Sequence, residues 1–516
     1  MMEPDYDVVI IGGALAGAGM GMLLKRELPA AKVLIVERSD AFSFKVGEST
    51  SEVGAAFLIR VLRLGSWLSR EQISKNGLRF WFSRPENSCA GRCAELGPKL
   101  QVRLPAYQLD RSKLDTHVLE LAAGEGCEVV RPGVVRDLHL EGQGKNRLTV
   151  STAGGNRTVT AKWVIDASGR AATIARQRGT LQNVEEHPTS SMWCRFQNVG
   201  DLDSQEMAVL HPEMPQRVWS QRSTATNHLT GDGWWAWVIP LQGGEVSVGL
   251  TWDRRIFTPP VEGSIPERLT AVLRSHPIGR YLMRDAVAVE KDAHFYGTVA
   301  YRNTQVMGDG WATVADASGF MDPLYSHGLD FLGNTVWAVH RIVCDALRGS
   351  DVRERIAAYE LNYRESFQRW FSSLYQDKYQ YIGDAELMNA AVLMDVGCYF
   401  IGPVRMVMED HHRNLASLPY GGPIGAAFAK FMSCYNRRLA RLGRLRREQG
   451  NFGPKNLDRH FIFRDSFQPG FAVRKLIYSG MRGWLKAECA MLWRRAPKSQ
   501  PMVRLSPEAT PLTPVP

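Results

Sequence analysis

A glycine-bearing turn near the N-terminus could hold the phosphates of a dinucleotide. Gly12, Ala14 and Gly17 follow the β-branched run 8–11 and match G-x-G-x-x-G, with alanine at the middle position. In this pattern the first glycine makes the turn, the second lets backbone approach a pyrophosphate, and the third packs helix on strand. The alanine methyl narrows that approach without closing it. Glu37 follows twenty residues after Gly17, where a carboxylate can hold a ribose hydroxyl and would repel a 2′-phosphate.

The segment 6–38 therefore reads as strand, turn, helix and strand, which is one βαβ unit ending in an acidic residue. An adenosine ribose, as in FAD or NAD, fits this unit best. The alternative is a Rossmann-like turn that binds no ligand. The residues expected to contact the nucleotide here are Gly12, Gly13, Ala14, Ala16, Gly17, Glu37 and Arg38.

Two later segments resemble flavoprotein motifs and favour FAD. Residues 164–169 (VIDASG) resemble the strand and turn beside the adenosine, and residues 315–323 (ADASGFMDP) resemble the loop GDA-x-x-x-x-P. The resemblance implies that Asp316 binds the ribityl chain and that a helix after Pro323 points its N-terminus toward the flavin. The usual glycine before the aspartate is an alanine here. The cofactor contacts implied are Arg111, Asp316, Gly319, Phe320 and Pro323. For Arg111, a solvated charge at a helix start is an equal alternative.

Three motifs together resemble the flavin-dependent halogenases: GEST at 47–50, WAWVIP at 235–240 and DPLYSHG at 322–328. In that family W-x-W-x-I-P lines the flavin side and keeps the substrate away from the flavin. The alternative for this motif alone is a tryptophan-rich core strand. The resemblance assigns cofactor contacts to Gly47, Glu48, Ser49 and Thr50. It assigns the substrate side and its tunnel to Trp235, Trp237, Ile239, Pro240 and Tyr325.

Lys75 is the catalytic residue that the resemblance implies. It stands in K-N-G-L-R-F-W, which resembles the segment K-x-G-x-x-F of halogenases that act on phenols and pyrroles. A lysine away from the flavin would hold hypohalous acid, either as an ammonium that polarises it or as an amine that forms a haloamine. Desolvation would lower the pKa of the lysine toward the amine. An ordinary surface charge is the alternative.

The segment DPLYSHG carries a further implication. Tryptophan halogenases place a glutamate where this chain has Tyr325, so the resemblance implies an electron-rich aromatic substrate, a phenol above all. Backbone N–H groups where loop meets helix could hold the halide, with the His327 side chain as a neighbour. The halide-site residues expected are Ser326, His327 and Gly328.

The resemblance also implies a reaction and its partners. Reduced FAD (FADH2) reacts with O2 to a C4a-hydroperoxide, chloride or bromide attacks it, and the hypohalous acid travels to Lys75 and then to the arene. No second nucleotide fingerprint appears for NAD(P)H, so a separate NAD(P)H-dependent flavin reductase is expected. Such chlorination or bromination serves natural-product pathways, antibiotic biosynthesis included.

Composition restricts the remaining possibilities. The 516 residues are 44% hydrophobic and 22% charged, which excludes a disordered or fibrous protein. The eight cysteines are scattered without zinc-ligand spacing, so no metal is expected. Free thiols and the lack of a signal-peptide pattern predict a cytoplasmic location. The net charge of +10 is concentrated in 430–504, which carries +14, and no nucleic-acid motif accompanies it, so nucleic acid is not an expected partner.

The basic segment suggests other partners. Residues 436–448 hold six arginines with leucines between them. Such a helix could dock the acidic face of an acyl or peptidyl carrier protein that bears the substrate, or make peripheral contact with an anionic membrane. The alternative is a solvated helix face, or a helix that packs on the body through its leucines.

The expected fold class is α/β: an FAD-binding Rossmann-like domain of the p-hydroxybenzoate-hydroxylase type, an inserted β-rich substrate domain and a helical C-terminal region. The expected ranges are 1–180 and 296–350 for the FAD domain, 181–295 for the substrate domain, 351–504 for the helical region and 505–516 for a disordered tail. The same architecture serves FAD-dependent aromatic monooxygenases and polyprenyl-type reductases, which is the alternative function. A flavin-fold protein that has lost catalysis and binds a partner is the third.

Overall fold

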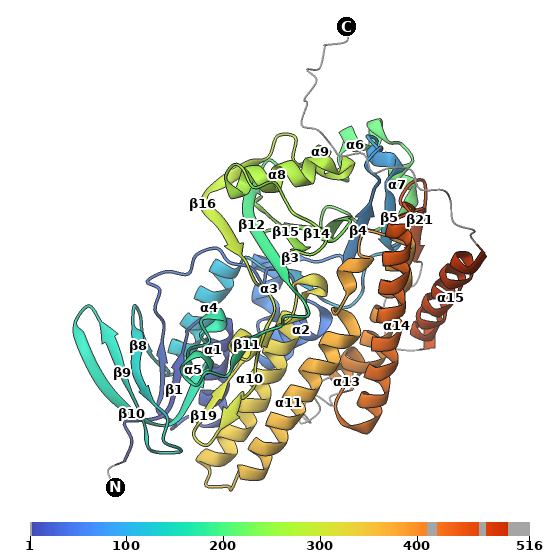
Figure 1. The fold of residues 1–516 in the computed structure, drawn as a ribbon. Coiled ribbons are helices and arrows are strands. Elements are labelled where there is room, and N and C mark those ends of the chain that lie inside the picture. The colour runs from blue at the N-terminus through green and yellow to red at the C-terminus, as the bar shows by residue number, and fades with distance from the viewer. Residues whose placement is uncertain (1–2, 410–419, 464–470, 494–516) are drawn as a thin grey trace.

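A computed structural model describes residues 3–409, 420–463 and 471–493 (Figure 1). The predicted tail 505–516 and residues 494–504 of the predicted helical region lie outside these ranges. Two large sheets and a set of long helices make up the described chain. The first sheet lies at the lower left of Figure 1, the second at the top, and the long helices at the right and below.

The first sheet is the predicted nucleotide-binding sheet. Its strands are β1 (Tyr6–Ile11), β2 (Val33–Val36), β7 (Glu128–Val130), β8 (Val134–His139), β9 (Asn146–Thr152), β10 (Gly155–Asp166), β18 (Met307–Gly308) and β19 (Trp311–Thr313). They run in the order β18-β19-β10-β1-β2-β7, with β9 paired to β10 and β8 to β9. β1 pairs in parallel with β2 and with β10, and β10 pairs in parallel with β19. The carboxyl ends of these strands therefore meet at one edge, where α/β sheets bind ligands.

Helix α1 (Leu15–Glu27) packs on this sheet, and α4 (Arg111–Gly124) and α10 (Gly328–Leu347) pack on α1. All of α1 from Leu15 to Leu24 is buried, as its lack of charged residues over that stretch requires. The chain returns to this sheet late in the sequence through β18 and β19, and α10 follows them.

The second sheet is larger than the predicted insertion. Its strands are β4 (Leu78–Phe82), β5 (Ala94–Pro98), β12 (Thr189–Gln197), β13 (Thr226–Gly231), β14 (Trp234–Pro240), β15 (Val246–Asp253), β16 (Val287–Tyr296) and β21 (His460–Phe463). They run in the order β16-β12-β15-β14-β13-β4-β5-β21. The predicted substrate range 181–295 thus lacks β4 and β5, which precede it, and β21, which lies in the region expected to be helical.

The two faces of the second sheet pack differently. On the outer face, Trp81, Trp234 and Ala236 join a core with α8 (Ile265–Ser275) and α9 (Pro277–Leu282). On the inner face, Phe80, Phe82, Trp235 and Trp237 join the main core of the protein. Successive side chains of a strand point to opposite faces, which explains why the two tryptophans of the W-x-W motif share the inner face.

Four long helices follow in the C-terminal part of the described chain: α11 (Arg353–Leu374), α12 (Ala385–Tyr399), α14 (Gly422–Glu448) and α15 (Phe471–Trp493). Helix α12 contacts β5 of the second sheet, α15 packs on α12, and α14 packs on α11. The stretch Ala385–Met408 is apolar and long enough to span a membrane by length and composition, but 72% of its most apolar window is buried within the protein, as in a core helix. Short helical turns continue or precede these helices: η6 (Lys378–Gln380), η7 (Phe400–Val404) and α13 (Arg405–Met408).

The remaining described elements are short. The strands are β3 (Ile73–Ser74), β6 (Tyr107–Gln108), β11 (Leu181–Asn183), β17 (Tyr301–Asn303) and β20 (Gly319–Phe320). The helices and helical turns are α2 (Glu52–Ala56), η1 (Phe57–Val61), α3 (Gly65–Glu71), η2 (Ala90–Arg92), η3 (Gly169–Ala171), α5 (Thr173–Gln177), α6 (Gln205–Leu210), α7 (Met214–Arg217), η4 (Ala315–Ala317) and η5 (Leu324–Ser326). η4 and η5 lie between β19 and α10, which is the loop that resembles a flavoprotein motif.

Candidate active site

The glycines of the N-terminal turn are required by the close approach of two backbone segments. Gly12 has φ +100°, and a Cβ atom there would lie 2.6 Å from the carbonyl oxygen of Ala167 in the VIDASG turn. A Cβ atom at Gly17 would lie 1.8 Å from the carbonyl oxygen of Gly12. Neither position can accept a side chain without displacing backbone. The turn is therefore compact enough for backbone to approach a ligand, as the fingerprint predicts.

Glu37 closes the turn from the end of β2. Its Oε2 accepts a hydrogen bond from Gly13 N at 2.7 Å, and its Oε1 accepts one from Ser39 N at 2.9 Å. Arg38 beside it is exposed, Ala16 is buried in α1, and Ala14 is partly exposed at the start of that helix. The structure therefore brings the predicted nucleotide residues of this unit together around one turn.

Arg111 is buried in an ion pair at the start of α4. Its Nη2 lies 3.0 Å from Asp115 Oδ1, and Lys45 contacts the same carboxylate. Burial alone would raise the pKa of Asp115, but the two cations hold it below its usual range. The same Oδ1 accepts a hydrogen bond from Leu15 N at 3.1 Å. Arg111 thus lies close to the first turn of α1. It is buried there, so the alternative of a solvated charge at a helix start does not describe it.

The backbone of the ADASGFMDP loop shows why glycine is usual at the position of Ala315. Ala315 has φ +53°, a left-handed conformation that favours glycine, and its N–H donates to Thr335 Oγ1 at 2.9 Å. Asp316 follows with a pKa raised by burial, which the charges of Arg111, Arg170 and Lys45 oppose. The other predicted contacts of this loop are Gly319 and Phe320 in β20 and Pro323 before η5. The loop and the N-terminal turn share this cationic environment.

These residues fit FAD. The turn is tight because neither Gly12 nor Gly17 leaves room for a side chain, Glu37 offers a carboxylate, and Asp316 offers a second one in the field of Arg111. The backbone at Ala14 and the start of α1 would face the pyrophosphate, and Glu37 and Asp316 would hold hydroxyl groups.

The GEST segment connects this region with the second sheet. Glu48 forms an ion pair with Arg195 of β12, with Oε1 to Nη2 at 2.8 Å, and burial raises the pKa of Glu48 to about 7. Ser49 Oγ lies 3.0 Å from Thr226 Oγ1. Gly47 has φ +94°, and a Cβ atom there would lie 2.4 Å from Arg111 Nη1. The cofactor role predicted for these residues stays a prediction.

Lys75 lines a cavity of about 70 Å³. Its side chain is 6% exposed, and its Nζ donates a hydrogen bond to the carbonyl oxygen of Thr50 at 2.7 Å. Burial lowers the pKa of Lys75 to about 8, although Glu52 and Asp330 oppose this shift. The position is therefore not the ordinary surface charge of the alternative interpretation. Residues of four regions enclose the cavity: 50–52, 75–106, 325–327 and 392–400, together with Phe463.

Aromatic rings extend from this cavity toward the second sheet. Phe80 stacks on His228 with centroids 4.6 Å apart, and the His228 ring lies 5.1 Å from that of Trp235. Trp235 Nε1 donates to Tyr379 Oη at 2.9 Å, and Tyr379 donates to Asp322 Oδ2 at 2.9 Å. The tryptophan of β14 is therefore connected, through two hydrogen bonds, to the loop that precedes α10.

The structure does not bring all the predicted substrate-side residues to the described cavity. Tyr325 lines it, whereas Trp235, Trp237, Ile239 and Pro240 do not. Trp237 Nε1 donates to Ser247 Oγ at 3.2 Å within the second sheet. The W-x-W motif lies on the same inner face as Phe80, and the His228 ring lies between the rings of Phe80 and Trp235.

The predicted halide residues begin α10 in a strained loop. Tyr325 and Ser326 have φ +69° and +64°, and Ser326 N donates to the carbonyl oxygen of Pro323 at 3.2 Å. His327 lines the cavity, and its Nδ1 accepts a hydrogen bond from Trp370 Nε1 at 3.3 Å. Burial lowers the pKa of His327 to about 3, so the ring is neutral. A neutral, hydrogen-bonded ring agrees with a neighbour of the site rather than a proton donor. Gly328 follows as the first residue of α10.

Several polar residues at the cavity carry no sequence signal. Glu52 and Asp330 face Lys75, and burial raises the pKa of Asp330 to about 7. Asp330 contacts Ser51 Oγ, and Tyr399 Oη donates to its Oδ2 at 3.2 Å. Asp395 of α12 lines the other part of the cavity. These residues come from segments between 51 and 395, and no motif connects them in sequence.

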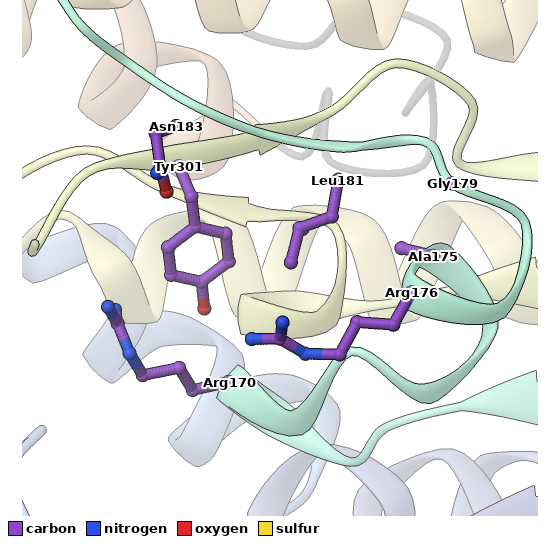
Figure 2. Close-up of a pocket in the computed structure, with 7 residues that line it drawn as sticks. All are labelled: Arg170, Ala175, Arg176, Gly179, Leu181, Asn183 and Tyr301. Atoms are coloured by element: carbon purple, nitrogen blue, oxygen red, sulfur yellow. The ribbon is translucent and has the colours of Figure 1, made fainter.

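A second cavity, of about 360 Å³, lies beside the 315–317 turn (Figure 2). Figure 2 shows Arg170 and Arg176 reaching into it, with the Tyr301 hydroxyl between their guanidinium groups in this view. Tyr301 Oη donates to the carbonyl oxygen of Asp316 at 2.8 Å. None of the residues predicted for the site lines this cavity.

One group of possible metal ligands occurs in the described ranges: Glu27, His340 and Cys344. Glu27 also pairs with Arg348, with Oε1 to Nη1 at 2.9 Å. An arginine on the carboxylate competes with a cation, so this group carries no assignment.

The basic C-terminal helix packs on the body. In α14, Leu439 and Leu442 are buried, and Arg446 forms a buried ion pair with Asp384, with Nη1 to Oδ2 at 2.7 Å. Two further arginines of the helix, Arg438 and Arg447, pair with Glu488 and Asp232. The exposed arginines are Arg437, Arg441 and Arg444. The leucine-packed alternative describes this helix, and three exposed cations remain along one stripe.

Comparison with known proteins gives a consistent result. A family model described as tryptophan halogenase matches residues 67–375. The chain is 25% identical over 434 residues to the flavin-dependent halogenase chlA of Dictyostelium discoideum, covering 77% of this chain and 69% of that protein. It is 25% identical over 469 residues to tetracycline 7-halogenase of Kitasatospora aureofaciens, covering 81% and 80%.

Solved structures agree on the fold. The crystal structure of halogenase PltM in complex with phloroglucinol and FAD has a TM-score of 0.73 at 21% identity, covering 94% of this chain and 96% of that one. This likeness confirms the predicted fold class, including its inserted sheet and helical regions.

Proposed function

The chain belongs to the tryptophan halogenase family of flavin-dependent halogenases, and we propose that it halogenates an electron-rich aromatic, a phenol, through hypohalous acid relayed to Lys75. The family model and the relatives named above are halogenases, which favours halogenation over the monooxygenase and polyprenyl-type reductase alternatives that the sequence left open. Its cofactor is FAD, and chloride or bromide is its halide. The observation that carries the proposal is the burial of Lys75 on an aromatic cavity.

The environment of Lys75 suits a halogen carrier. FAD, when bound and reduced, would supply hypohalous acid from O2 and halide. The amine of Lys75 displaces hydroxide from that acid, so an N–X bond forms, the X–O bond breaks, and the N–H proton leaves with hydroxide as water. The arene then takes the halogen, and its ring proton returns the lysine to an amine. A pKa of about 8 leaves a useful fraction of amine near neutral pH.

The remaining cavity residues restrict water and orient the arene. Phe80, Tyr325, Tyr399 and Phe400 supply aromatic walls, and His327 contributes a neutral ring. A mostly apolar wall with a few convergent polar groups is typical of a small-molecule site. It lacks a described cation other than Lys75, so the lysine is the one ammonium or amine that the described lining presents to a substrate.

The test is a mass-spectrometric assay of resorcinol with FAD, a flavin reductase, NADH and either chloride or bromide. Wild type should add one halogen, and Lys75→Ala should lose the product while still binding FAD. The matched control is Lys113→Ala, an exposed lysine on α4. Oxygen addition by the wild type, or halogenation that survives Lys75→Ala, would overturn the proposal. Consumption of NADH without the reductase would overturn the separate reductase partner.

A carrier protein is the proposed macromolecular partner. Two relatives are named for chlorination and bromination of 1H-pyrrole-2-carbonyl-[peptidyl-carrier protein], in Pseudomonas fluorescens and Pseudoalteromonas luteoviolacea. The exposed stripe of Arg437, Arg441 and Arg444 offers positive charge for the acidic face of such a carrier. A cytoplasmic location, supported by eight free cysteines, is part of the same proposal.

Reversing the charges of the three exposed arginines tests carrier docking. Arg437→Glu, Arg441→Glu and Arg444→Glu together should lower turnover of a carrier-tethered hydroxybenzoyl group and leave free resorcinol unchanged. Reversal of Lys113, far from α14 in sequence, serves as the control. An unchanged rate with the tethered substrate contradicts carrier docking. Loss of binding to anionic vesicles with unchanged tethered turnover would instead favour membrane contact.

A further inference from the structure

The polar residues that border the cavity fall into two clusters. The first surrounds Lys75 and includes Thr50, Glu52 and Asp330. The second consists of Asp395, Tyr325 and Lys378. No described hydrogen bond or ion pair joins one cluster to the other, yet Lys75 and Asp395 line the same cavity. Apolar side chains complete the lining around them: Leu78, Phe80, Leu96, Val392, Val396 and Phe400.

Asp395 is held by two donors at a single oxygen. Its Oδ2 accepts hydrogen bonds from Tyr325 Oη at 2.9 Å and from Lys378 Nζ at 2.7 Å. The three residues come from α12, η5 and η6, so the cluster joins three elements. No described residue donates a hydrogen bond to Asp395 Oδ1. The aspartate is 6% exposed and lines the cavity, which leaves Oδ1 as its remaining acceptor there.

Burying the charges of Lys378 and Asp395 costs free energy, which suggests a role for the pair beyond stability. Lys378 is 1% exposed. Its ammonium also lies over the Tyr325 ring, 5.5 Å from the ring centroid. Burial raises the pKa of Asp395, and the bonds from Lys378 and Tyr325 oppose that shift. A buried ion pair is a weak source of stability, because apolar residues of similar volume often do as well. A carboxylate beside a bound ammonium is, however, a strong hydrogen-bond acceptor.

We propose that Asp395 Oδ1 accepts a hydrogen bond from the hydroxyl group of the phenolic substrate and so orients the ring toward Lys75. The inference rests on the proposed function and adds the residue that recognises the hydroxyl. The ring lies along the apolar wall between the two clusters, with its hydroxyl at Asp395 and a ring carbon toward Lys75. No covalent bond changes at Asp395. A charge-assisted hydrogen bond also donates electron density to the ring, which favours electrophilic substitution.

The test compares two probes of similar shape in the holoenzyme. Resorcinol has hydroxyl donors, and 1,3-dimethoxybenzene has none. The variant is Lys378→Met with Asp395→Leu, which removes both charges and leaves neither one buried alone. We expect kcat/KM for resorcinol to fall by about 10- to 100-fold, the range for a lost hydrogen bond to a charged group. The rate for 1,3-dimethoxybenzene should stay within about twofold of wild type.

Two controls separate recognition from structure. Asp395→Asn alone keeps the size of the side chain and should also discriminate against resorcinol. Arg438→Met with Glu488→Leu removes an ion pair outside the cavity lining and should leave both probes unchanged. An equal loss for both probes in the Lys378/Asp395 variant would show that the pair only supports the fold, and would overturn the inference while the proposed function stands.

The proposed function fails if wild type halogenates neither probe. A binding measurement then still tests the inference. Titration of each probe into FAD-loaded protein, followed by NMR, gives its Kd without turnover. The inference requires the Kd of resorcinol to rise about tenfold or more in the double variant. An unchanged Kd for resorcinol overturns it.

Discussion

Lys75 and Lys378 are both buried beside the same cavity, but their charges are balanced differently. Lys75 donates to a backbone carbonyl, and its neighbours Glu52 and Asp330 form no described ion pair with it. Lys378 lies 2.7 Å from the carboxylate of Asp395. A direct partner holds an ammonium in its charged form, whereas burial without one favours the amine. The comparison teaches that the same residue type becomes a candidate halogen carrier in one region and a counter-ion in the other.

The largest expected effect separates the two lysines by activity. Lys75→Met should lower kcat/KM for halogenation by about 1,000-fold or more, because the relay of the halogen to the arene is lost. Lys378→Met should retain the relay and lower the rate much less in the folded protein. The measurement is single-turnover product formation with saturating FADH2. Equal losses in the two variants would erase the functional difference.

The next largest effect concerns the free energy of unfolding of Lys378 and Asp395 variants. Lys378→Met or Asp395→Leu alone should lower the free energy of unfolding by about 3–5 kcal/mol, because each leaves one buried charge without its partner. The double variant should recover most of this loss. Chemical denaturation of the three variants checks it. Additive single effects in the double variant would contradict a coupled pair.

A smaller effect concerns pH. With a pKa of about 8 for Lys75, the amine fraction rises about tenfold between pH 7 and pH 9. The rate of the halogen-transfer step should therefore rise through this range and level off above it. Single-turnover rates across pH 6–10 measure it, with hypohalous acid supplied at constant concentration. A rate that falls through pH 8 would show that the ammonium is the working form.

A Lys75 substitution that lowers activity should raise the stability of the fold. The folded-state pKa of Lys75 lies below its unfolded value of about 10.5, so protonation at pH 7 disfavours the fold. Lys75→Met should therefore stabilise the protein by about 1 kcal/mol at pH 7, after loss of the bond to Thr50 is included. This gain should disappear as pH rises through the interval from 8 to 10.5. A destabilised Lys75→Met at pH 7 would contradict a costly buried charge.

The smallest effect is a gain in stability from one substitution in the 315–323 loop, where both the motif and the backbone conformation favour glycine. Ala315→Gly should stabilise the protein by about 0.5–1 kcal/mol, because the residue has φ +53°. Thermal unfolding of the protein without FAD measures the gain. Ala317→Gly in the same turn is the control and should not stabilise, since that residue does not have a positive φ.

Much of the first sheet could be predicted from sequence because its signals are local. Gly12 and Gly17 are required by backbone contacts within one βαβ unit, and Glu37 ends the strand that follows. The period-2 alternation of 234–240 likewise placed Trp235 and Trp237 on one face. The extent of the second sheet could not be predicted, because β4, β5 and β21 join it from positions far apart in the chain.

The sequence by itself determined the dinucleotide turn, the family resemblance and the identity of Lys75 as a candidate. Each depends on residue types at fixed short spacings. Only the tertiary structure decided that Lys75 is buried without a carboxylate partner among the described residues, that Asp395 shares its cavity, and that three of the six arginines at 436–448 are paired with the body. Those facts depend on side chains from distant elements meeting in one volume, where burial and charge set their chemistry.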